Sequence, residues 1–274
     1  MQQALKNFFS GNALRLFTIL LGAYTTIAIF VNFSTDVLLH AAVTFGSVIL
    51  VYFLWKKVSG KNTLPWNWAI SAMIVFLLLH PFGDTASLIA AALLGPLLFV
   101  VKKIAFRGRP VVNPAVGALL LLAVIGFFFP FFGLVTVSWW GAAFAGSWSL
   151  LFLAPAFFVA VQWFRKWIIA SAHIATFLVL TVLSQDVNVA IFAVTHSTLY
   201  FLAGIMLLEP KTSPTKPYEQ LCFGMLSGIL VALFFNYPPV LPSALTALFV
   251  ANAIYFFWRE HAFFSFPKSS SSHA

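Results

Sequence analysis

Long apolar runs, broken by short polar or Pro/Gly-rich stretches, fill the chain from near residue 14 to near residue 258. A helix that crosses a bilayer needs about 20 predominantly apolar residues, so the pattern predicts an all-α polytopic membrane protein of about ten transmembrane helices. The predicted segments lie near residues 14–33, 37–55, 66–82, 86–101, 113–133, 143–163, 167–185, 187–208, 219–236 and 240–258.

The composition agrees with a chain embedded in a lipid bilayer. Of the 274 residues, 62% are hydrophobic and 8% are charged, and the mean hydropathy is +1.00. A soluble globular domain carries about 25% charged residues. We therefore interpret residues 1–274 as a single membrane domain, with halves at about 14–133 and 143–258 and a serine-rich cytoplasmic tail at 260–274.

The charges indicate the orientation of the segments. If the N-terminus is cytoplasmic and ten segments follow, every lysine and arginine falls on the cytoplasmic side, whereas Asp36, Asp84 and Asp186 fall on the other. Cytoplasmic loops carry the excess of Lys and Arg in membrane proteins. The pattern predicts a multi-pass protein of the inner (cytoplasmic) membrane with both termini in the cytoplasm. Because the net charge of +9 follows from this topology, it does not indicate nucleic-acid binding.

Two proline-containing stretches occur twice in the chain. "RPVVNPAVGALLLL" at 109–122 resembles "YPPVLPSALTALFV" at 237–250, and "LLLHPFGDTAS" at 77–87 resembles "MLLEPKTSPTK" at 206–216. Proline breaks a helix, and irregular backbone at membrane depth is tolerated only where protein or a polar cavity satisfies it. We expect the repeated stretches to form the walls of a buried site.

The spacing of the copies predicts an inverted repeat. Pro81 and Pro210 are 129 residues apart, and Pro114 and Pro242 are 128 residues apart. This period spans five predicted helices, so the second copy enters the membrane from the opposite side. Inverted repeats place their site between the halves, near the bilayer midplane.

Two stretches resemble a known family. "FRGRPVVNPAVGALLL" together with "LLEPKTSPTKPYEQLCFGMLSGIL" resembles the RnfD/NqrB family, the membrane subunits of ion-pumping ferredoxin:NAD and NADH:quinone oxidoreductases. Members carry a basic residue ahead of F-N-P-A, and D-P-x-T-S-P ahead of a glycine-rich helix. The matching residues are Asn113, Pro114, Ala115, Pro210, Thr212, Ser213 and Pro214, with Glu209 in place of the aspartate. The resemblance implies a five-plus-five inverted repeat with a fold similar to urea transporters.

The sequence departs from the family at the flavin attachment site. Pumping members bear FMN on a threonine in an S-G-A-T type motif preceded by an acidic residue on the outer side. The corresponding loop reads "GLVTVSWWGAAFAGSWS" and lacks both features, and "VSGKNT" at 58–63 lies on the inner side. We therefore expect no covalent FMN, but a non-covalent flavin (FMN or riboflavin) or a quinone between the halves.

Polar residues beside the repeated stretches are the candidates for cofactor binding. Arg107 and Arg109 stand before a helix entrance and suit a phosphate or another anionic group, although inner-loop topology alone also explains them. Asn113 is expected to cap the helix that Pro114 begins, and it is also a candidate to bind the edge of a flavin or quinone ring.

The second stretch supplies the remaining candidates. Glu209, at the boundary between membrane and cytoplasm, has three possible roles. It can bond Thr212 or Ser213 in a local turn, pair with an arginine of the other half, or take part in ion or proton movement. The candidate cofactor-binding residues are thus Arg107, Arg109, Asn113, Pro114, Glu209, Thr212 and Ser213.

Other chemistry is largely excluded. Cys222 is the single cysteine, which rules out disulfides and Cys-ligated metal clusters, and we expect no metal site. One haem held by His40 and His80 is conceivable, although packing is the commoner role of an intramembrane histidine. The sequence contains no Walker A, H-E-x-x-H, G-x-S-x-G or dinucleotide motif. Reducing equivalents would therefore come from a partner.

Three functions fit these observations. The first is a membrane electron-transfer subunit that receives electrons from a cytoplasmic or membrane redox partner subunit through the flavin or quinone. The second is a channel or transporter for a small solute or a flavin-like vitamin. The third is a cofactorless membrane anchor for a soluble reductase, whose acidic surface would suit the basic inner loops.

Overall fold

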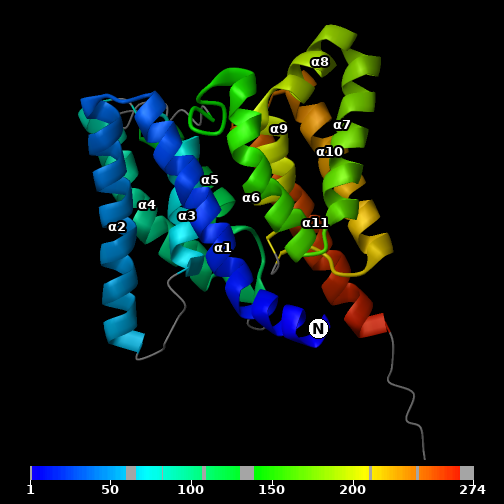
Figure 1. The fold of residues 1–274 in the computed structure, drawn as a ribbon, viewed down its shortest axis with the longest axis horizontal. Coiled ribbons are helices and arrows are strands. Elements are labelled where there is room, and N and C mark those ends of the chain that lie inside the picture. The colour runs from blue at the N-terminus through cyan, green and yellow to red at the C-terminus, as the bar shows by residue number, and fades with distance from the viewer. Residues whose placement is uncertain are drawn as a thin grey trace, which may run out of the picture.

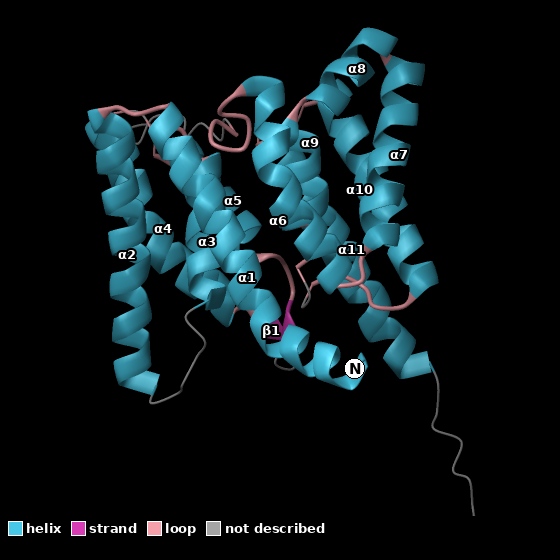
Figure 2. Ribbon diagram, viewed as in Figure 1, coloured by secondary structure: helices cyan, strands magenta, loops and turns pink. Residues whose placement is uncertain are grey.

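The computed structural model describes residues 2–59, 66–81, 83–106, 109–129, 139–209, 212–238 and 241–265. Side chains are described over the same ranges apart from 2–13, 105–106, 109 and 261–265. Within them the chain is helical except for its loops and one short pair of strands (Figure 2).

The first half is helical wherever the sequence predicts an apolar segment. It contains α1 (Gln2–Val31), α2 (Thr35–Ser59), α3 (Trp66–Leu78), α4 (Thr85–Lys103) and α5 (Pro114–Phe128). Two-residue antiparallel strands, β1 (Ala105–Phe106) and β2 (Arg109–Pro110), lie between α4 and α5.

The second half also follows the predicted segments. It contains the 3-10 turn η2 (Gly146–Trp148), α6 (Ser149–Trp163), α7 (Trp167–Ser184), α8 (Val187–Thr195), α9 (Ser197–Phe201), the π-helical segment η3 (Leu202–Met206), α10 (Pro217–Asn236) and α11 (Ser243–Ser265). The all-α prediction is confirmed.

Several helices are long and apolar enough to cross a membrane. In the described part of the chain six qualify singly: Leu14–Val31, Thr35–Ser59, Thr85–Lys103, Gly146–Trp163, Trp167–Ser184 and Pro217–Asn236. A seventh crossing results if α8 and the α9–η3 helix, which are bent by 66° relative to each other, form one span. The apolar helices α3 and α5 have only 13 and 15 residues. These lengths support a membrane protein, and the count of ten crossings stays a prediction.

The two halves stand side by side (Figure 1). In the first half α4 packs along α2, and in the second half α10 packs along α7. The halves meet where α1 contacts α6 and where α5 contacts α11. The N-terminus and the end of α11 both lie at the lower end of the molecule in Figure 1.

The contact between α2 and α4 compensates for a proline inside α4. Pro96 has no N–H, so the carbonyl of Ala92, four residues earlier, loses its helical donor. The Ser47 hydroxyl of α2 donates to this carbonyl and accepts from the Gly95 N–H at 3.1 Å. Because Gly95 has no side chain, α2 can approach closely enough for both bonds.

The contact between α7 and α10 depends on a glycine pair spaced four residues apart. A Cβ at Gly224 would lie 2.7 Å from the Ile169 carbonyl oxygen, and one at Gly228 would lie 2.8 Å from the His173 carbonyl oxygen. Small residues at this spacing let membrane helices pack backbone to backbone. Between the glycines, Ser227 Oγ accepts from His173 Nδ1 (2.8 Å) and donates to the Gly224 carbonyl (2.9 Å).

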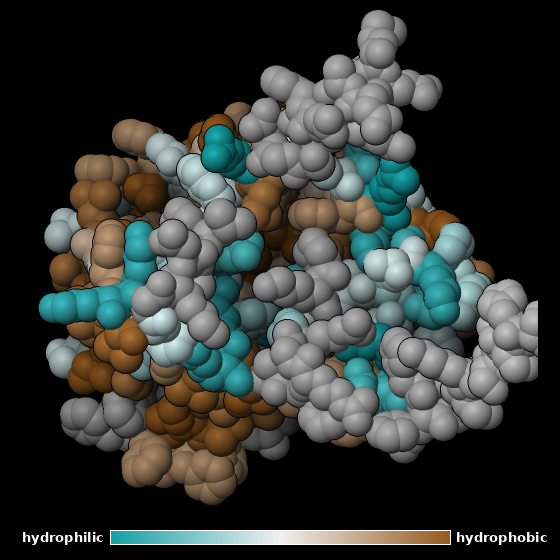
Figure 3. Space-filling model, turned by 90° about the horizontal axis from the view of Figure 1, so that it is seen from below, coloured by the Kyte–Doolittle hydropathy of each residue, from teal (hydrophilic) through white to brown (hydrophobic). Residues whose placement is uncertain are grey.

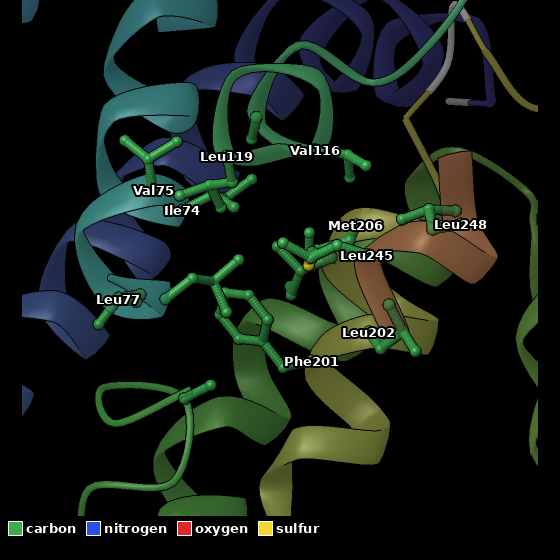
Figure 4. Packing of buried hydrophobic residues seen from close by; sticks show 14 of the residues in the cluster. Ile74, Val75, Leu77, Val116, Leu119, Phe201, Leu202, Met206, Leu245 and Leu248 are labelled. Atoms are coloured by element: carbon green, nitrogen blue, oxygen red, sulfur yellow. The ribbon is translucent and has the colours of Figure 1, made fainter. Parts of the chain in front are cut away.

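Apolar side chains fill the region where the short and broken helices of the two halves meet (Figure 4). The side chains labelled in Figure 4 are at most 4% exposed. Those drawn in Figure 4 include Leu77 of α3, Val116 and Leu119 of α5, Phe201 of α9, Met206 of η3, and Leu245 and Leu248 of α11.

Acidic and basic residues lie at opposite ends of α2 and α4. Asp36 stands in the first turn of α2 and Asp84 caps α4, whereas each helix ends in a lysine pair. The Lys103 ammonium lies 3.0 Å from the centroid of the Trp55 ring at the end of α2. Figure 3 shows the lower end of the molecule, where hydrophilic side chains gather on both sides of an apolar interior.

The glycine contact predicts a stability difference between two Gly→Ala variants. Gly224→Ala should destabilise the protein by about 1–3 kcal/mol, because the new methyl group overpacks the contact between α7 and α10. Gly46→Ala in α2 should be neutral or slightly stabilising, because nothing lies within 4 Å of its Cβ position. Thermal unfolding of the detergent-solubilised variants measures both, and equal behaviour would contradict this account of the contact.

Candidate functional site

Asn113 joins the two halves of the protein. It caps α5, and its Oδ1 accepts from the N–H groups of Ala115 (2.9 Å) and Val116 (3.4 Å). Its Nδ2 donates to the carbonyl of Met206 in the second half at 3.0 Å. Asn113 is only 3% exposed. The predicted cap and the predicted helix start at Pro114 are confirmed.

The Met206 carbonyl is available because the helix ends there. The segment η3 is π-helical, with the Leu207 N–H donating to the Leu202 carbonyl at 2.9 Å. After Met206 the chain turns away, so this carbonyl has no following helical turn to supply a donor. The amide of Asn113 replaces that donor, so the stretch at 109–122 contacts the stretch at 206–216.

A buried turn follows directly after this junction. The Glu209 carbonyl accepts from the N–H groups of Thr212 (3.2 Å) and Ser213 (3.1 Å) and from the Ser213 hydroxyl (2.8 Å). Thr212 and Ser213 are each 4% exposed. Glu209 therefore bonds both residues through its main-chain carbonyl, and the three predicted roles of its carboxylate stay predictions.

Lys166 holds the same turn from the start of α7. Its ammonium donates to the carbonyl oxygens of Ser213 (3.4 Å) and Pro214. The side chain is almost completely buried, and burial lowers the pKa of Lys166 from 10.5 to about 8, although the nearby charge of Glu219 acts in the opposite direction. The pKa of Lys216, an exposed lysine, is instead raised by its hydrogen bond to Glu219, so Lys166 differs chemically from this surface lysine.

The remaining predicted site residues are described only in part. Arg107 and Pro210 lie outside the described residues. The backbone of Arg109 pairs with Phe106 in the short ladder that leads to Asn113, and its side chain is not described. The structure thus places Asn113 and Pro114 beside Met206, and the chain continues from Met206 into the Glu209–Ser213 turn.

Asn252 is a buried polar residue that the sequence reasoning missed. It lies in the middle of α11 and is 1% exposed, and neither Oδ1 nor Nδ2 has a hydrogen-bond partner among the described residues. Leu248, one turn earlier on α11, lies beside Val116 and Met206, two of the three residues that Asn113 binds (Figure 4). The signal in the sequence is one asparagine within the apolar run "ALFVANAIYFF".

His40, one of the two predicted haem ligands, is packed against other side chains. His40 is completely buried, and its ring stacks on Phe76 with 5.3 Å between the centroids. No group of three or more His, Cys, Asp or Glu side chains that could hold a metal occurs in the described part of the chain.

A scan against protein-family models finds no match, and a search of the curated proteins finds none either.

Two substitutions of Asn113 should distinguish the contribution of its helix cap from that of its bond to Met206. Asn113→Ala removes the cap and leaves the Met206 carbonyl without its donor, so the free energy of unfolding should fall by about 2–4 kcal/mol. Asn113→Ser keeps a capping oxygen without adding a buried charge and loses the bond to Met206, so it should cost less. Thermal unfolding in detergent tests this order; equal losses would show that the cap contributes nothing, and an unchanged stability of Asn113→Ser would show that the link between the halves contributes nothing.

The depressed pKa of Lys166 predicts a pH-dependent stability. Between pH 8 and pH 10.5 the unfolded chain binds a proton at Lys166 that the folded protein has already released. Stability should therefore rise with pH across this window. Lys166→Met should remove this increment, whereas Lys56→Met, at an exposed position, should retain it. Unfolding midpoints measured from pH 7.5 to about 10 give the comparison, and parallel curves for wild type and Lys166→Met would contradict it.

Proposed function

We propose that this chain is a membrane electron-transfer subunit of the RnfD/NqrB type. It holds a non-covalent flavin or a quinone between its two halves and passes electrons from a cytoplasmic partner subunit into or across the membrane. Its fold is a ten-helix, five-plus-five inverted repeat similar to urea transporters.

The packing of the helices supports the repeat. The second and fourth helices of each half pack together, as α2 with α4 and α7 with α10. The fourth and fifth do the same, as α4 with α5 and α10 with α11. The third element of each half is short or broken, and each first helix packs against it, α1 on α3 and α6 on α9 and η3. These three kinds of helix contact occur in both halves, which supports the proposed repeat.

The single observation that carries the proposal is the bond between Asn113 and Met206. Met206 directly precedes the second stretch that resembles the family, which begins at Leu207, and its bond to Asn113, 93 residues away in sequence, holds the start of that stretch beside the first one. A resemblance by chance would give no reason for the two stretches to meet. The N-terminus of α5 and the buried Lys166 also supply positive charge near the junction, which suits an anionic group of a cofactor.

The amide of Asn252 favours flavin over quinone as the ligand. A primary amide offers a donor and an acceptor side by side, and both are without partners in the described residues. The imide edge of a flavin ring carries a complementary N–H and C=O, whereas a quinone carries only acceptors. A flavin therefore uses both halves of the Asn252 amide.

The distribution of charge supports a cytoplasmic electron donor. The lysines that end α2 and α4 lie at one end of these helices, and the aspartates lie at the other. By the positive-inside rule, the lysine end faces the cytoplasm, with both termini on that side of the inner membrane. An acidic redox partner would dock favourably there.

The transport alternative has less support. A channel for a polar solute needs polar groups along its path, and the side chains where the short and broken helices meet are apolar and buried (Figure 4). A cofactorless anchor would need no unpaired amide at Asn252.

The proposal predicts a releasable chromophore. The detergent-purified protein should be yellow and fluorescent, and acid precipitation should move the flavin to the supernatant, because no covalent attachment is expected. Flavin left in the pellet would contradict non-covalent binding. A colourless protein would overturn flavin binding, and the same preparation would then be extracted and tested for quinone.

Replacing Asn252 should weaken retention of the flavin. Asn252→Leu removes two hydrogen bonds, which predicts a loss of affinity of roughly tenfold. The control is Asn32→Leu, because the Asn32 side chain bonds only the Ala28 carbonyl of its own helix. The measured quantity is flavin bound per protein after gel filtration. Equal retention in the two variants would remove Asn252 from the site.

A further inference from the structure

His40 and Thr44 of α2 are two further buried polar residues, and they lie beside the C-terminal end of α3, away from the candidate flavin site. His40 and Thr44 stand one turn apart on the same face of α2, and both are 0% exposed. Within the described residues, the two ring nitrogens of His40 and the hydroxyl of Thr44 make no hydrogen bond of ordinary geometry, and the Leu79 carbonyl is the backbone group that interacts with the His40 ring. Three buried polar atoms in one place therefore lack a hydrogen bond of ordinary geometry, and each costs free energy unless something binds it.

Thr44 differs from the other buried threonines of the bundle. Thr18, Thr25 and Thr181 each donate to the carbonyl four residues earlier in their own helix. Thr44 does not, although its own helix continues on both sides. Its hydroxyl is thus free to bind a group beside His40.

The carbonyl end of a broken helix lies beside His40. The helix α3 ends at Leu78, and the His40 ring stacks on Phe76 in its last turn. The final carbonyls of α3 are capped by the residues that lead into α6. Trp140 Nε1 donates to Phe76 (3.0 Å) and Leu79 (2.7 Å), and the Gly141 N–H donates to Leu77 (3.0 Å).

The end of α3 offsets part of the cost of a positive charge at His40, which burial of the ring and the nearby His80 oppose. The C-terminus of a helix carries the negative end of the helix dipole, which stabilises a cation nearby. In membrane proteins the ends of discontinuous helices bind protons and small cations for this reason. The described ionisable groups around His40 are Asp36 one turn earlier on α2, His80 in the loop after α3, and Asp84 at the start of α4. The helix α3 has no ionisable residue, and the lysines of α4 lie at its other end.

We infer that His40 and Thr44 form a proton-binding site, reached from the end of the molecule that carries Asp36 and Asp84. A hydronium ion from that side gives its proton to a ring nitrogen of His40 and leaves as water. The resulting imidazolium donates to Thr44 Oγ1 directly or through water. The site lies at the opposite end of the bundle from the lysines, so it supplies protons from the side away from the proposed electron donor.

Ring ¹⁵N NMR of histidine-labelled protein in nanodiscs tests this site. On acidification from about pH 8 to about pH 3, one imidazolium signal should appear that is absent from His40→Gln. Thr44→Val keeps the side-chain shape but removes the acceptor, so it should move the midpoint of this signal to lower pH. His173→Gln should leave the signal unchanged, because His173 is held by Ser227 between α7 and α10.

Two results would overturn the inference. His40 could keep one neutral tautomer across the whole pH range, or its titration could be identical in wild type and Thr44→Val. Because Thr44→Val changes only one buried hydroxyl, it serves as the test if His40→Gln does not fold. The measurement needs no bound flavin, so its outcome is independent of the proposed electron transfer.

Discussion

Every backbone N–H and C=O in the apolar interior needs a hydrogen-bond partner, and this constraint governs where the helices of this protein break and join. Pro96 removes a donor from α4, and Ser47 of α2 supplies another. The last carbonyls of α3 bond Trp140 and Gly141. The carbonyl of Met206 bonds Asn113. Each broken end thus requires another segment in one fixed position.

This constraint also explains why the two halves hold together. Leu–Leu contacts between membrane helices give little preference for one arrangement over another, because lipid is equally apolar. Hydrogen bonds to a helix end permit only one arrangement. Asn113 combines both functions, since it starts α5 and closes η3 with the same side chain. The apolar cluster around Leu119 and Leu248 can then pack densely between ends that are already fixed.

Much of the fold can be predicted from the sequence because it follows from local pattern. Apolar runs of about 20 residues give the helices, and the Asn113–Pro114 pair gives the start of α5. Pro81 indicates that the helix breaks before residue 82, but its end at Leu78 could not be predicted, because that end depends on the bonds of Trp140 to the Phe76 and Leu79 carbonyls. The apolar segment predicted at 66–82 accordingly ends at Leu78 as a helix.

The candidate site likewise combines residues that local sequence pattern predicts with residues whose role depends on contacts between distant segments. Its cap and turn are local features, so Asn113, Thr212 and Ser213 could be singled out from the sequence. The burial of Lys166 and the unpaired amide of Asn252 depend on packing between distant segments. Sequence placed Lys166 only among the basic residues of one membrane side, and it gave no reason to separate this lysine from the others.

Labelling of single cysteines in sealed, oriented vesicles tests the central claim most directly, which is that the two halves cross the membrane in opposite directions. In a Cys222→Ser background, the account predicts that a membrane-impermeant maleimide labels Lys57→Cys and Lys216→Cys from one side. It labels Asp84→Cys and Asp186→Cys only from the other side. If Lys57→Cys and Asp84→Cys react from the same side, α3 does not cross the membrane, and the five-plus-five inverted repeat is wrong.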